Sequence, residues 1–151
     1  MATPPLEAII DKVLELLKAQ KLDGIRSYMF GDPLTYPSFE LPAVAVAPLN
    51  ETVVAHTMGA RGRDMRGPAI RIFVVMSAKD GYNSATKESP VDRKLIQHAE
   101  AVLEVLRANI DLEGTVVTFK EGAVQYVPAV RGREAVRMAQ VDCRFEVLKS
   151  R

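Results

Sequence analysis

The sequence predicts an α+β domain in which a mostly antiparallel β-sheet carries two amphipathic helices. Two segments repeat apolar residues at helical spacing, and most of the others alternate or cluster them as strands do. The resulting order, αβββαβββ, is typical of helices packed on an antiparallel sheet. A chain of 151 residues without a linker or repeat fits one domain, so we expect residues 1–151 to fold as a single unit.

The first helix is predicted over residues 3–20. Thr3 can cap it and Pro4 suits its first turn. One face is charged, and the other repeats apolar side chains every three or four residues: Leu6, Ile9, Ile10, Val13, Leu16 and Leu17.

The second helix follows a polar, turn-rich loop at residues 79–90. Ser89 is the expected cap, with Pro90 at the first position and Asp92 three residues after the cap. The expected buried stripe consists of Leu95, Ile96, Ala99, Val102, Leu103 and Leu106.

The segment 25–30 is predicted as a short strand. Three further strands are predicted between it and the second helix. Residues 43–47 are apolar on both faces, which indicates an interior strand covered on both sides. Residues 51–58 make a weaker strand and residues 69–78 a strong one. After Asn109 we expect strands at 116–120, 123–130 and 134–148, and the last alternates apolar and polar residues as a strand with one wet face does.

Composition limits the function. The formal net charge is +1, so no global field draws the chain to DNA or to a membrane. Cys143 is the only cysteine, so four-cysteine zinc sites and internal disulfides are excluded. The N-terminus does not resemble a secretory signal, and no apolar run approaches the roughly 20 residues that span a bilayer.

Residues that could carry catalysis are few. His56 and His98 have no metal-like partner at helical spacing, and Cys143 falls on the apolar face of its strand. No glycine loop has the form of a phosphate cradle. We therefore expect no catalytic residue, metal or cofactor, and interpret His98 as a partly exposed helix residue.

The stretch "HTMGARGRDMRGPAIRIFVV" places Arg61, Arg63, Met65 and Arg66 in a glycine-rich segment ahead of a strand. One interpretation is a solvated hairpin tip. The other is a flexible arm, residues 58–68, whose guanidinium groups bind carboxylates of a neighbouring protein or phosphates of nucleic acid. Arginine in place of lysine, and a methionine in a polar segment, favour contact with a partner.

The order of the segments resembles the tail terminator (tail completion) proteins of long-tailed bacteriophages, the lambda-type family. The resemblance covers nearly the whole chain. It begins with the helix "LEAIIDKVLELLKA", a segment ending in "FGDP" and the extended "YPSFELPAVAVAP". It continues through a polar excursion, the strand "IRIFVVMSA", the helix "LIQHAEAVLEVLRANI" and the terminal strands "VQYVPA…REAVRMAQVDCRFEV".

The resemblance implies a structural virion protein, assembled in the host cytoplasm, that forms a hexameric ring on the finished tail tube. Such a ring ends tube polymerisation, contacts the major tail tube protein, and presents a surface to the head-side connector. DNA passes through its lumen without specific binding. In that family the long loop between strands contributes to ring or tube contacts, and Arg61, Arg63, Met65 and Arg66 would lie there. Two alternatives stay open: a head–tail connector or stopper subunit, and a cellular α+β binding domain or small enzyme.

Overall fold

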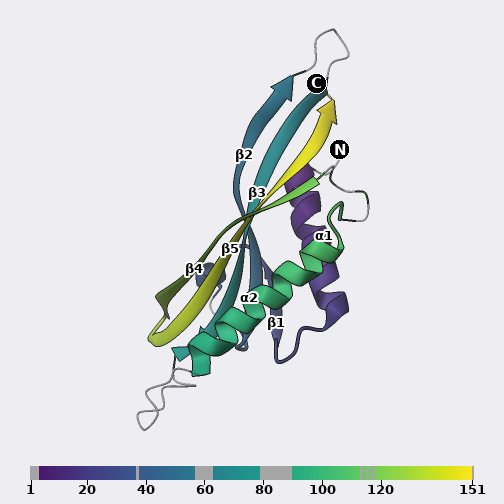
Figure 1. The fold of residues 1–151 in the computed structure, drawn as a ribbon. Coiled ribbons are helices and arrows are strands. Elements are labelled where there is room, and N and C mark those ends of the chain that lie inside the picture. The colour runs from purple at the N-terminus through teal and green to yellow at the C-terminus, as the bar shows by residue number, and fades with distance from the viewer. Residues whose placement is uncertain are drawn as a thin grey trace.

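The computed structural model describes residues 4–36, 38–56, 63–78, 90–112, 114, 116 and 118–150. They form a single α+β domain, as predicted, with two helices packed on a five-stranded and mostly antiparallel sheet (Figure 1). In chain order the elements are α1 (Pro5–Gln20), β1 (Ser27–Phe30), the 3₁₀ turn η1 (Pro33–Thr35), β2 (Ala43–His56), β3 (Arg63–Ser77), α2 (Pro90–Ala108), β4 (Thr118–Arg131) and β5 (Glu134–Ser150).

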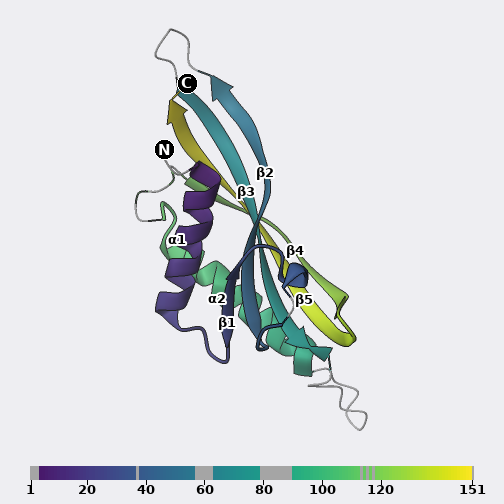
Figure 2. The same cartoon turned by 180° about the vertical axis from the view of Figure 1, so that it is seen from behind.

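The strands follow the order β1-β2-β3-β5-β4, so β3 is the central strand. Only β1 and β2 run parallel; the other three pairs are antiparallel. Seen from behind, β1 is short and lies beside one half of β2, while the other half of β2 extends past it (Figure 2). Beyond the start of β4, the strands β2, β3 and β5 continue together as a three-stranded ribbon (Figure 1).

Both helices cover the same face of the sheet, which we call the helix face. The main core lies between them and inward-facing residues of β2, β3 and β5. The alternation predicted for β5 is confirmed, because Val141, Cys143, Phe145 and Val147 are all buried there. Burying these side chains supplies most of the driving force for folding.

We call the opposite face of the sheet the open face, because neither α1 nor α2 covers it; a loop covers part of it. Residues 31–42 bring Tyr36, Phe39 and Leu41 over a second apolar cluster, made of Met29, Ala43, Ala45, Ala47, Phe73, Val75, Val136 and Met138. Arg131 binds this loop at Phe39. Its Nη1 donates to the Phe39 carbonyl at 2.7 Å, and its guanidinium lies 4.2 Å from the Phe39 ring centroid. Residues 43–47 are therefore buried on both faces, as predicted.

The start of α1 differs from the prediction by one residue. The helix begins at Pro5, with Pro4 at the N-cap and no side-chain capping bond. Proline at the first position costs nothing, since that N–H has no partner within a helix. The expected cap, Thr3, lies outside the described residues. At the other end Lys21 adopts a left-handed conformation (φ 49°), and its N–H donates to the Lys18 carbonyl.

The buried stripe of α2 also needs a correction. Ile96 was expected inside, but it is 56% exposed, while Val91 and Val105 are buried. The buried positions 91, 95, 99, 102 and 106 follow one helical row, and Ile96 stands a full residue step, or roughly 100°, away from Leu95. The expected cap, Ser89, lies outside the described residues.

Two pairs of predicted strands are in fact single strands. Segments 43–47 and 51–58 belong to one strand, β2, whose register shifts between Pro48 and Asn50. Segments 116–120 and 123–130 meet in β4, with a shift between Glu121 and Val124. β-bulges absorb both irregularities without ending the strand. At Gly122 a Cβ would lie 2.8 Å from the Asp142 carbonyl oxygen, so only glycine fits this bulge without a shift.

Candidate interaction surface

Part of the predicted arm is a strand. Arg61 lies outside the described residues, but Arg63, Met65 and Arg66 belong to β3, which begins at Arg63 and not at residue 69. This part of β3 is paired on both sides: Arg66 lies opposite Val53 of β2 and Val147 of β5. Backbone pairing with two neighbours therefore outweighs the glycine-rich, charged composition that suggested a loop.

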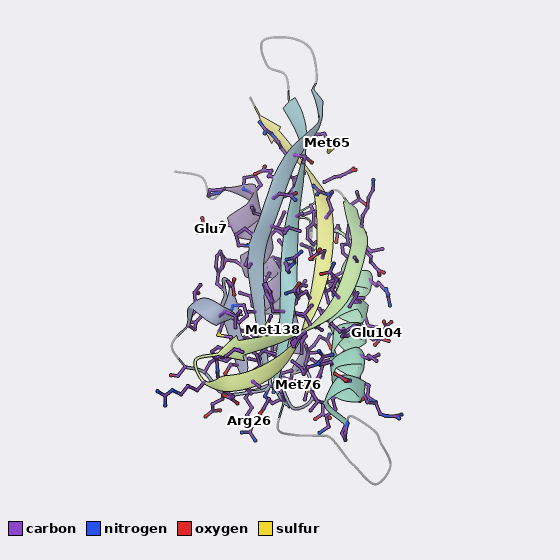
Figure 3. All side chains as sticks on the ribbon, turned by 90° about the vertical axis from the view of Figure 1, so that its left-hand side faces the viewer. Glu7, Arg26, Met65, Met76, Glu104 and Met138 are labelled. Carbon is purple, nitrogen blue, oxygen red and sulfur yellow. The ribbon has the colours of Figure 1, made fainter. Side chains whose placement is uncertain are left out.

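Met65 and Arg66 do not share a surface. Successive residues of a strand point to opposite faces, which places Met65 on the open face and Arg66 on the helix face, beside the buried Val147. Both side chains are half-buried. Met65 lies towards one end of the molecule, whereas Arg26 and Met76 lie towards the other (Figure 3). The residues proposed for contact therefore do not form one basic patch within the described part of the chain.

The uncovered half of the open face carries a polar network that sequence reasoning missed. Arg71 of β3 binds Asp142 of β5 through two bonds, of 2.7 Å from Nε and 3.1 Å from Nη2. This hydrogen bond raises the pKa of Arg71. Next along β5, Arg144 donates to the Gly67 carbonyl at 2.6 Å, to Asn50 Oδ1 at 2.9 Å and to Thr52 Oγ1 at 3.2 Å. These bonds join β2, β3 and β5.

Arg71 and Lys120 of this face pair with carboxylates of the same subunit, while Arg144 donates to neutral oxygens. Lys120 of β4 lies 3.3 Å from Glu146 of β5, beside the Arg71–Asp142 pair. On the helix face, Arg107 of α2 binds Glu121 of β4 and Glu100 of its own helix. The bond to Arg107 lowers the pKa of Glu121. The surface is thus polar and nearly neutral.

The two edges of the sheet are both incomplete. β1 covers β2 only at residues 43–46, so the outer edge of β2 from Ala47 onward has no strand partner among the described residues. On the other side β4 is the edge strand, and most of its residues are exposed. Tyr126 is 40% exposed and Val130 65%. The sequence does contain a signal for this edge, since residues 122–130 include no charged residue.

The one histidine whose side chain is described lies beside a surface pocket. His98 of α2 is half-buried, as predicted, and borders a hollow of about 540 Å³ together with Arg26, Lys94 and Asp23. Burial lowers the pKa of His98; Asp23 opposes this shift and Lys94 adds to it. Within the described ranges no group of three or more His, Cys, Asp or Glu side chains could hold a metal ion.

We expect the Cys143 thiol to be unreactive towards alkylating reagents in the folded protein. It is 1% exposed, and burial raises the pKa of its thiol to about 12, with Glu121 and Asp142 adding to the rise. The thiolate is the reactive form, so at pH 8.5 iodoacetamide should label the native protein on the order of 1,000-fold more slowly than the urea-unfolded chain. Equal rates, followed by mass spectrometry, would show that the β5 assignment is wrong.

No protein-family model matches the chain, and no curated protein matches it. None of the helices in the described part of the chain is long and apolar enough to cross a membrane.

Proposed function

We propose that the protein is a structural subunit that closes into a ring and caps the tail tube of a long-tailed phage. One observation carries this proposal: a single subunit has an open edge on each side of its sheet, at β2 beyond Ala47 and along β4. Exposed edges must be covered or paired, and copies arranged head to tail can complete both edges of every subunit. The order of elements along the chain supports the same family of ring proteins.

The electrostatics are compatible with a collar around DNA. The formal net charge is +1, and the polar side chains of the open face bind one another. A strongly basic lumen would hold phosphates, whereas a balanced surface lets the duplex pass. Contact between the tube or connector and the segment that holds Arg61, Arg63, Met65 and Arg66 remains part of this proposal.

The test is the mass of the assembled protein. Purified protein, alone or mixed with the major tail tube protein of the same phage, should give a species of about six times 16.6 kDa in native mass spectrometry. Added to polymerising tube protein, it should shorten the tubes seen by electron microscopy. A ring that binds the head-side connector but leaves tube growth unchanged would favour the connector or stopper function. A chain that stays monomeric under all these conditions would overturn the ring.

A further inference from the structure

The open edge of β2 adjoins an apolar groove. Leu6 and Ile10 of α1, Phe30 at the end of β1 and Pro48 of β2 line a hollow of about 380 Å³. Glu7 stands at its rim and is exposed. The groove opens on the helix face, because α1 forms one wall. Phe30 is 40% exposed, so apolar surface remains uncovered there.

The β4 edge has side chains that suit such a groove. Val124 packs against the core beneath the helices, so by alternation Tyr126 and Val130 also lie on the helix face. Both are exposed. A tyrosine has an apolar ring and a hydroxyl donor, which matches an apolar groove with a carboxylate, Glu7, at its rim.

The two edges also match in direction and face. β2 is antiparallel to β3, β3 to β5 and β5 to β4, so β2 and β4 run in opposite directions. Suppose that a second copy continues the sheet of the first, related to it by a rotation about the ring axis. The β4 strand of one copy then lies antiparallel to the β2 strand of the other, and the helix faces of both copies lie on the same side. Neither edge segment carries the lysines that natural edges use to prevent pairing: residues 122–130 are uncharged, and residues 47–56 contain only Glu51.

Resting on the ring function proposed above, we infer that the β4 edge of one copy docks along the open β2 edge of a second copy of this chain. Tyr126 enters the groove between Leu6, Phe30 and Pro48, and its hydroxyl donates to Glu7. The contact is heterologous, because each copy offers β4 on one side and β2 on the other. Such contacts form a ring when the rotation between neighbouring copies closes, and they cover both the β4 edge and the open part of β2.

The register sets the tilt of the subunits. Within one subunit Glu121 of β4 is level with Pro48, through Cys143 and Ile70. Bringing Tyr126 to Pro48 of the neighbour shifts β4 by about four paired positions, roughly 13 Å, and over the four strands β2, β3, β5 and β4, spaced about 4.8 Å, this is a tilt of about 35°. Strands of closed barrels tilt by a similar angle, roughly 35–45°.

Cysteine cross-linking tests the contact directly. The only native cysteine, Cys143, is buried, so Phe30→Cys and Tyr126→Cys each add one accessible thiol. Under a short bis-maleimide reagent, each variant alone should stay uncoupled, a mixture of the two should give dimers, and the double variant should give a ladder up to the full ring. Dimers from Tyr126→Cys alone would mean a symmetric β4–β4 contact and would overturn the inference.

Charge substitution provides a second readout. Tyr126→Lys should raise the apparent dissociation constant of the assembly about 30-fold or more, as loss of an interface anchor does. The control is Ile96→Lys, which also replaces an exposed apolar residue, on α2, and should leave assembly unchanged. Circular dichroism checks that each variant is folded, and Val130→Cys replaces Tyr126→Cys if that variant is not.

Failure of this inference is distinguishable from failure of the ring function. If the wild type forms rings that the β4 variants do not weaken and the mixed cysteines do not couple, the ring is built through other surfaces and only the edge contact is wrong. If the wild type stays monomeric with and without tube protein, both proposals fall.

Discussion

Replacing Phe145 with alanine should lower the free energy of unfolding by about 3–5 kcal/mol. Phe145 is fully buried and is the largest such side chain in the core between the helices and the sheet. It also lies against Phe119 of β4, with ring centroids 5.4 Å apart and planes tilted by 31°. The alanine variant removes the transfer free energy of the ring and leaves a cavity that a β-sheet cannot readily close.

Urea denaturation followed by circular dichroism measures this loss. If the free energy of unfolding depends on urea concentration with the same slope in the wild type and the variant, the two unfold to similar states. Ile96→Ala is the control: Ile96 is 56% exposed on α2 and lies outside the proposed contact between copies, so its effect on stability should stay within about 0.5 kcal/mol. A loss below about 1 kcal/mol for Phe145→Ala would mean that β5 does not present this face to the helices.

The prediction for Phe145 depends on a feature that the sequence alone predicts well. Apolar and polar residues alternate through β5, and a strand has only two faces, so the pattern identifies the buried side without knowledge of any partner. The fold class and both helices follow from patterns of the same local kind, and both are confirmed.

The boundaries were harder to predict because distant partners decide them. Pro48 and Gly122 are typical turn or breaker residues, yet pairing with one neighbouring strand, β3 for Pro48 and β5 for Gly122, holds them in bulges. The same holds for Arg63 and Arg66, which composition assigned to a loop and which pairing with β2 and β5 places in a strand. No local window of sequence contains those pairings.

The candidate surface was predicted even less completely. Arg71 and Asp142 bind each other across 71 residues of sequence, and Arg144 reaches Asn50 across 94. The groove likewise combines α1, β1 and β2, and only the tertiary arrangement brings Leu6, Phe30 and Pro48 together. The uncharged run at 122–130 was visible in the sequence, but its position on an edge depends on the strand order.

The second large effect is expected at adjacent positions of α2, where Leu95→Ala should cost about 2–5 kcal/mol and Ile96→Ala less than about 0.5 kcal/mol. Leu95 is fully buried against the sheet, whereas Ile96 is 56% exposed. Alanine also has the higher helix propensity, so the exposed substitution can be slightly stabilising. The pair is well matched, because both variants remove several methylene or methyl groups from neighbouring residues of one helix.

Thermal and urea unfolding give the stability loss of each variant, and comparing the two losses shows which side of α2 faces the sheet. A stripe centred on the predicted set, with Ile96 inside, would make both substitutions costly, whereas the observed stripe makes only Leu95 costly. Equal losses would therefore show that α2 is turned relative to the arrangement described here, and that the outer face used for the Ile96→Lys control is not a free surface. A large difference between the two variants would establish that Leu95 faces the sheet and that Ile96 faces solvent. Only a fixed helix orientation separates adjacent residues so strongly.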